Sequence, residues 1–167
     1  MMLVSDTSVL IDLERGGFVE AIFALPHRFA VPDALYRREL LGELGNRLVR
    51  LGLRVEEVSE QGVAGAIRYR QQRPSLSVTD SLALALAKER QWTLLTGDSE
   101  LRRLAVSENV ECHGVLWLLD LMEEAGTPGI RLLHDGLEAV GNHPRCRLPR
   151  AEITVRLERY RMIMFRK

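Results

Sequence analysis

The stretch SVTDSLALALAKERQWTLLTGDSELRRLA, residues 77–105, decides the fold class. Residues 80–90 are apolar almost all the way round a helix, which is typical of a helix buried inside a domain. Residues 92–95 then form a short apolar run that predicts a buried strand. The turn at 96–98 leads into another short helix, which reaches Ala105. A buried helix, a buried strand and a further helix in succession indicate a parallel sheet covered by helices.

The rest of the chain continues this alternation. Apolar runs predict further strands at residues 3–4, 29–31, 53–58 and 109–113, with helical patterns between them, and Ser59 is expected to cap the helix that follows the third of these. Residues 45–50 are weakly patterned and fit either a short helix or a loop. Strands that alternate with helices predict a three-layer α/β/α architecture with a central parallel β-sheet.

The length and the change in pattern define the domain organisation. The 167 residues suit one domain, and a hydrophobic content of 46% is enough for an ordinary core. The alternating pattern occupies residues 1–125, whereas residues 126–167 are helical and rich in arginine towards their end. We interpret 1–125 as the core and 126–167 as a C-terminal helical extension of the same domain.

Charge, cysteine content and hydropathy exclude several classes of protein. The formal net charge is zero, so any nucleic acid must be bound by local basic patches. Cys112 and Cys146 are far apart and form no CxxC pair, which argues against a disulfide framework or a thiolate zinc site. The N-terminus does not have the pattern of a signal peptide, and the apolar runs are too short to cross a membrane. We therefore expect a cytoplasmic protein without membrane segments.

Four acidic residues stand where the loops after parallel strands converge. Asp6 and Asp98 directly follow predicted strands, Asp80 stands at the start of the buried helix, and Glu39 lies on another helix. Carboxylates from different loops are suitable ligands for Mg²⁺, and such an ion neutralises the charge that develops in phosphodiester cleavage. Taken singly, each aspartate also suits a helix N-cap, and Glu39 also suits a solvated surface.

Five segments resemble the PIN-domain family. VSDTSVLIDL (4–13) resembles the opening strand with its first acid, VPDALYRRELL (31–41) the helix with the second, and residues 77–105 the stretch with the third and fourth. ECHGVLWLLDLM (111–122) resembles the strand and helix that follow. RCRLPRAEITVRLERY (145–160) is similar to the closing helix of some single-domain bacterial members.

The resemblance implies a metal-dependent endoribonuclease, most often the VapC-like toxin of a type II toxin–antitoxin pair. The residues it implies as catalytic and as ligands of Mg²⁺ or Mn²⁺ are Asp6, Glu39, Asp80 and Asp98. Ser8 and Thr96, beside two of these acids, would donate hydrogen bonds to the ligands, or would cap helices. The implied partners are an RNA substrate, a small antitoxin protein and a second copy of the chain in a homodimer.

Arginines are the candidates for RNA contact. Arg68, Arg70 and Arg73 lie just before Asp80 and could bind phosphates, although arginines on an amphipathic helix commonly form a solvated face. We assign no aromatic residue to base stacking. The four histidines show no metal-ligand spacing with one another and are interpreted as structural or surface residues.

Two other classes of protein also place aspartates after parallel strands, and the sequence fits both of them poorly. A receiver domain would need a paired acidic cluster where the chain has Asp6 alone, and a phosphatase of the haloacid-dehalogenase type would need an aspartate at Ser8. Two alternatives keep the PIN scaffold: a non-catalytic module that binds protein partners, and an RNA-processing nuclease that is not a toxin. Binding of a divalent metal separates the first of these from a nuclease.

Overall fold

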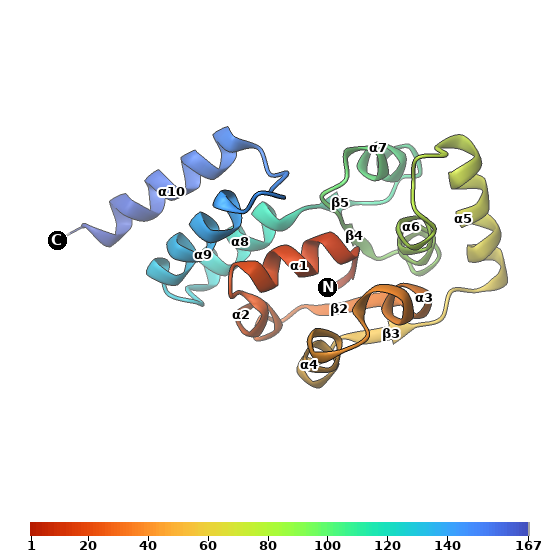
Figure 1. The fold of residues 1–167 in the computed structure, drawn as a ribbon, viewed down its shortest axis with the longest axis horizontal. Coiled ribbons are helices and arrows are strands. Elements are labelled where there is room, and N and C mark those ends of the chain that lie inside the picture. The colour runs from red at the N-terminus through yellow and green to blue at the C-terminus, as the bar shows by residue number, and fades with distance from the viewer. Residues whose placement is uncertain (167) are drawn as a thin grey trace.

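Parallel strands form the centre of the computed structural model, which describes residues 1–166. Within these residues, five strands pair in parallel in the order β3-β2-β1-β4-β5. Their bounds are Met2–Ser5 (β1), Arg28–Pro32 (β2), Arg54–Glu56 (β3), Thr93–Leu95 (β4) and Cys112–His113 (β5). Helices cover both faces of the sheet (Figure 1), and the predicted three-layer α/β/α class is confirmed.

Helices connect the strands as the sequence pattern predicts. They are α1 (Thr7–Arg15), α2 (Val19–Phe23), α3 (Asp33–Leu35), the π-helix η1 (Tyr36–Leu40), α4 (Glu43–Leu51), α5 (Glu60–Gln72), α6 (Val78–Arg90), α7 (Ser99–Ser107), α8 (Val115–Ala125), α9 (Ile130–Asn142) and α10 (Arg150–Met164). Ser59 caps α5, as expected, and residues 45–50 belong to α4. The strands predicted over 53–58 and 109–113 are shorter than expected, because β3 and β5 lie at the sheet edges and each pairs with one neighbour.

Alternation along β1 sends neighbouring side chains to opposite faces of the sheet. Leu3 joins the hydrophobic cluster on the α1 side, and Val4 joins the cluster around α6. Helix α6 contacts β1, β2 and β4, while α5 packs on its outer side (Figure 1). Because α6 lies between the sheet and other helices, it needs apolar residues all round, which explains its run of Leu and Ala.

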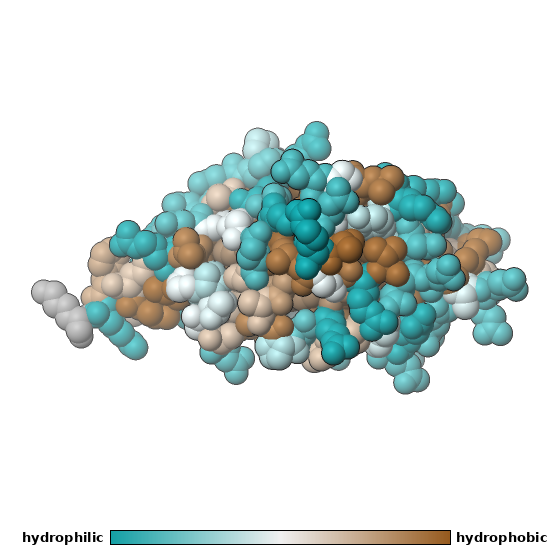
Figure 2. Space-filling view, turned by 90° about the horizontal axis from the view of Figure 1, so that it is seen from below, coloured by the Kyte–Doolittle hydropathy of each residue, from teal (hydrophilic) through white to brown (hydrophobic). Residues whose placement is uncertain are grey.

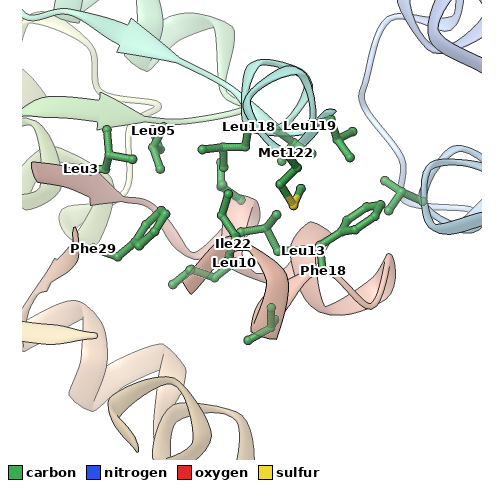
Figure 3. Close-up of a cluster of buried hydrophobic side chains, with 14 of the residues drawn as sticks. Leu3, Leu10, Leu13, Phe18, Ile22, Phe29, Leu95, Leu118, Leu119 and Met122 are labelled. Atoms are coloured by element: carbon green, nitrogen blue, oxygen red, sulfur yellow. The ribbon is translucent and has the colours of Figure 1, made fainter. Parts of the chain in front are cut away.

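The cluster on the α1 side extends from the sheet into the C-terminal helices. Figure 3 shows side chains of β1, β2 and β4 facing those of α1, α2 and α8; the labelled residues are Leu3, Leu10, Leu13, Phe18, Ile22, Phe29, Leu95, Leu118, Leu119 and Met122. Leu133 and Leu137 of α9, and Ile153 and Tyr160 of α10, are buried in the same cluster. Helices α9 and α10 therefore share a hydrophobic cluster with the sheet and α1.

Helix α9 approaches the end of α1 closely at a glycine. A Cβ atom on Gly136 would lie 2.3 Å from the ring of Phe18 and 2.4 Å from the carbonyl oxygen of Gly16. Only a residue without a side chain allows this approach. The Phe18 ring therefore packs directly against the backbone of α9 at Gly136 and holds this helix against the N-terminal part of the chain.

The helices are short or carry many charges. Helix α10, with 15 residues, includes Arg150, Arg156 and Arg159. Over residues 1–166, no helix combines the length and the apolar character that crossing a membrane requires.

Candidate functional site

The strand order places two predicted acids at one edge of the sheet. Strands β2 and β3 lie on one side of β1, and β4 and β5 lie on the other. Where the connections diverge in this way, a crevice opens at the carboxyl ends of the strands. Asp6 directly follows β1, and Asp98 follows β4 at a distance of three residues. The parallel register of β1 and β4 brings both loops to this crevice.

Asp6 is buried and held by hydrogen bonds. Its side chain accepts from Ser8 Oγ at 2.9 Å, from the Val9 backbone N–H at 2.9 Å and from Thr96 Oγ1 at 2.5 Å. Only 2% of its surface is exposed, and burial raises its pKa in spite of these hydrogen bonds. Within residues 1–166 no arginine or lysine pairs with it. A buried carboxylate without a cationic side chain as partner is a suitable ligand for a metal ion.

Thr96 connects Asp6 to the loop that carries Asp98. The buried Thr96 hydroxyl donates to Asp6 and accepts from the Asp98 backbone N–H at 3.0 Å. Asp98 caps α7, since its Oδ1 accepts from the Leu101 N–H at 2.9 Å. Capping uses one carboxylate oxygen and leaves Oδ2 for another partner. The sequence offered helix capping and metal binding as alternative roles for Asp98. The two roles are compatible, because capping uses only one of its carboxylate oxygens.

Asp80 does not cap its helix, so of the two roles that the sequence left open for it the cap is excluded. Ser77 is the N-cap of α6, and its Oγ accepts from the Asp80 backbone N–H at 3.0 Å. The Asp80 carboxylate is therefore not occupied by capping and lines the crevice. Burial raises the pKa of Asp80 to about 6, and repulsion from Asp6, Asp98 and Glu39 adds to the shift.

Glu39 lies beside the three aspartates but outside the crevice that they line. Its exposed side chain, on η1, accepts hydrogen bonds from Thr7 Oγ1 and, at 2.9 Å, from Thr79 Oγ1. Thr7 and Thr79 are the sequence neighbours of Asp6 and Asp80. These hydroxyls connect Glu39 to the site and fix the position of its carboxylate.

The crevice is a cleft of about 270 Å³ that brings carboxylates and arginines together. We call it the acidic cleft; its charged lining residues are Asp6, Asp12, Arg15, Asp80, Asp98, Arg145 and Arg147. Asp12 was not singled out from the sequence, although Ser8, Asp12 and Arg15 follow the i, i+4, i+7 spacing of one helix face. Burial raises the pKa of Asp12, and the Arg15 guanidinium opposes that shift.

The arginines predicted for RNA contact do not line the acidic cleft. Arg68 and Arg70 lie on α5, on the outer side of α6, and Arg73 directly follows that helix (Figure 1). Arg70 Nε donates to the Leu76 carbonyl oxygen at 3.1 Å, and Arg73 lies 3.8 Å from the Glu100 carboxylate.

Two other arginines reach the cleft from a segment distant in sequence. Arg145 and Arg147 lie between α9 and α10, and both are exposed. Over the described residues 1–166 neither pairs with a carboxylate, whereas Arg156 and Arg159 of α10 are held by Asp120. The sequence shows that the C-terminal segment is rich in arginine, but only the packing of α9 identifies the two residues that face the acids.

A second set of potential metal ligands lies on α9. In residues 1–166, His134, Asp135 and Glu138 form the one group of three whose ligand atoms all lie within 4.8 Å of one another. The His134 Nδ1 is 3.0 Å from the Asp135 Oδ1. The sequence analysis did not compare the histidines with neighbouring carboxylates, so it did not identify this combination.

The acids of the cleft lie farther apart than the ligand atoms of His134, Asp135 and Glu138. Within the described residues, no three of these acids have carboxylate oxygens that all lie within 4.8 Å of one another. Repulsion between carboxylates favours such spacing. A Mg²⁺ ion keeps several of its waters and is bound through few direct carboxylate contacts. The hard oxygen donors, the burial of Asp6 and the volume of the cleft therefore fit a hydrated divalent ion.

Comparison with protein families gives a match over residues 2–161, to a family described as a PIN domain. A search of curated proteins gives no significant match. PIN domains are generally nucleases. Of the four acids singled out from the sequence, Asp6, Asp80 and Asp98 line the acidic cleft, and Glu39 lies outside it. Because the match covers nearly the whole chain, the protein belongs to the PIN-domain family.

Proposed function

We propose that the chain is a metal-dependent endoribonuclease that hydrolyses RNA phosphodiester bonds in the acidic cleft. The observation that carries this proposal is the placement of Asp6, Asp80 and Asp98 across one cleft from Arg145 and Arg147. Carboxylates are suitable ligands for a divalent cation, and arginines bind phosphate with paired hydrogen bonds. A metal ion held by the acids and the arginines would both stabilise negative charge on the phosphate during hydrolysis.

The acids would hold Mg²⁺ or Mn²⁺, directly or through water. When bound, such an ion neutralises charge on the phosphate and lowers the pKa of the attacking water. Asp6, Asp80 and Asp98 are the proposed principal ligands. Glu39, held by Thr7 and Thr79, completes the acidic side of the site or orients the attacking water.

The remaining side chains position these groups. Ser8 and Thr96 hold the Asp6 carboxylate in one orientation through their hydrogen bonds. Arg145 and Arg147 bind the substrate phosphate and stabilise the negative charge that increases during the reaction.

Cleavage of a mixed RNA by purified protein tests the proposal. The reaction is run with Mn²⁺ or Mg²⁺ and with EDTA, and the wild type is compared with Asp98→Asn, which keeps the size of the side chain but removes a ligand charge. We expect cleavage by the wild type with metal, and none with EDTA or in the variant. Equal cleavage by both proteins would indicate a contaminant or another site. A protein that binds no divalent ion would favour the non-catalytic scaffold.

Thr96→Val tests whether the hydroxyl orients the ligands. Valine keeps the shape of the side chain but neither donates to Asp6 nor accepts from the Asp98 N–H. Loss of such a supporting contact typically weakens metal binding about 10- to 100-fold. Calorimetric titration with Mn²⁺ measures the change. Thr154→Val, at an exposed position on α10, is the matched control and should bind as the wild type does.

We propose further that the nuclease is a VapC-like toxin that acts in the cytoplasm and is inhibited by a small antitoxin protein. This part of the proposal depends on the family resemblance. Expression of the wild type without its partner should stop growth, and expression of Asp98→Asn should not. An active nuclease that leaves growth unaffected would favour an RNA-processing role.

The homodimer is also a proposal. Figure 2 looks from below onto the side that carries α4 and β3 in Figure 1, and hydrophobic residues lie there among hydrophilic ones. Leu41, Val49 and Val55, from this part of the chain, are 68%, 43% and 41% exposed. Exposed apolar side chains of this kind suit contact with a second copy. Sedimentation analysis tests this, and a monomer at high concentration would contradict it.

A further inference from the structure

A second pocket adjoins the acidic cleft, at the carboxyl end of β5. It encloses about 410 Å³, and we call it the aromatic pocket because His113 and Trp117 contribute to its lining. It shares Gly97, Arg147 and Leu148 with the acidic cleft. The two hollows are therefore neighbours, and one chain of nucleotides can reach both.

The aromatic side chains of this pocket are stacked on each other. The ring centroids of His113 and Trp117 are 4.0 Å apart, and the ring planes differ by 9°. His113 ends β5, and Trp117 lies in the first turn of α8. Both are partly exposed, and the imidazole is fixed at 2.8 Å from the Glu111 carboxylate. A rigid aromatic pair that borders an open pocket is a surface on which a nucleobase can stack.

Cationic groups flank the aromatic pair. Arg102 lines the pocket and is oriented by a 3.1 Å hydrogen bond from its guanidinium to the Thr96 carbonyl oxygen. Arg147 lines both the aromatic pocket and the acidic cleft, and pairs with no carboxylate in the part of the chain that is described, residues 1–166. A phosphate bound by Arg147 would lie between the acids and the aromatic rings.

We infer that the aromatic pocket binds the base of an unpaired nucleotide next to the phosphate that is cleaved. The base stacks on the His113–Trp117 pair, and Arg147 positions the phosphate that joins this nucleotide to the acidic cleft. A base inside a duplex is already stacked and paired, so it cannot enter the pocket. The inference rests on the proposed nuclease function and adds a base-binding subsite to it.

Tryptophan fluorescence tests the stacking directly. The chain contains two tryptophans, so Trp92→Phe leaves Trp117 as the only indole. This variant is combined with Asp98→Asn, which prevents cleavage, and titrated with a short single-stranded RNA in Mg²⁺ buffer. We expect quenching of Trp117 by the single strand and little change with the same strand in a duplex. The reciprocal variant, Trp117→Phe, keeps Trp92 and should show no quenching.

Affinity measurements on the same Asp98→Asn background supply an independent test. Trp117→Leu should weaken binding of the single strand roughly 5- to 150-fold, as expected for the loss of one stacked base. Arg147→Ala should weaken binding and lower its dependence on salt concentration, whereas Arg150→Ala, at an exposed position outside both pockets, should change neither.

Two results would overturn the inference, and they differ in what they imply for the nuclease. In the first, the wild type cleaves the RNA, but RNA binding neither quenches Trp117 fluorescence nor weakens when Trp117 is replaced. The base-binding subsite would then be wrong, and the proposed nuclease function would stand. If the protein neither binds nor cleaves any RNA, both are wrong. Because the quenching is measured with Trp117 intact, a folding defect in Trp117→Leu cannot produce or hide the result.

Discussion

Asp6→Asn is expected to lower RNA cleavage by about 10²- to 10³-fold, the loss typical when one preorganised charge-stabilising group is removed. Asparagine has the same shape and still caps α1, but it supplies no negative charge to a metal ion. The melting temperature should stay constant or rise, because a buried carboxylate without a cationic partner destabilises the fold. Cleavage assays and thermal unfolding on the same preparation measure both effects.

Asp135→Asn is the matched control for this prediction. It makes the same chemical change in the α9 group, where the Asp135 side chain is 64% exposed. We expect it to retain wild-type cleavage. If cleavage were lost in Asp135→Asn and kept in Asp6→Asn, the metal would belong to α9 and the proposed site would be wrong.

Phe18→Ala should produce the largest loss of stability among the substitutions considered. The Phe18 ring is 1% exposed and packs between α1 and α9, beside Leu13 and Met122 (Figure 3). Truncation of a buried phenylalanine costs about 3–5 kcal/mol of unfolding free energy, because it leaves a cavity. For a chain of this size, the melting temperature should fall on the order of 10 °C. Chemical denaturation gives the free energy.

Phe165→Ala provides the comparison, since this phenylalanine is 78% exposed near the end of α10. Its free energy of unfolding should change by about 0.5 kcal/mol or less. If Phe18→Ala cost no more than Phe165→Ala, α9 would not be held to the N-terminal part of the chain through this ring.

The local pattern of the sequence was sufficient to predict the layers of the fold and the sheet edge at which Asp6 and Asp98 lie. Helix α6 is apolar on all sides because it is enclosed, and this could be read from residues 80–90 directly. Asp6 and Asp98 could be placed at one sheet edge because parallel strands end together. The sequence left the role of Asp80 open between a helix cap and a site residue, because Ser77 and Asp80 both suit an N-cap and only the backbone geometry shows that Ser77 takes that role.

The basic and aromatic sides of the site could not be predicted from local pattern. Arg68 and Arg70 precede Asp80 in sequence, yet α5 carries them to the outer side of α6. Arg147 follows Asp98 by about fifty residues and reaches the cleft because α9 packs against α1. His113 ends a strand and Trp117 lies in the first turn of a helix, and their rings stack across the junction. Neither the two-residue repeat of a strand nor the 3.6-residue repeat of a helix predicts a contact there.

The hydrogen bond between Thr96 and Asp6 joins residues 90 positions apart, and this separation determines when during synthesis the site can form. Asp6 leaves the ribosome early, but the hydroxyl that orients it belongs to the turn after β4. Arg145 and Arg147 emerge later still. If the chain is the proposed nuclease, a growing chain would be unable to cut RNA at this site until the segments that carry Thr96, Arg145 and Arg147 had been translated.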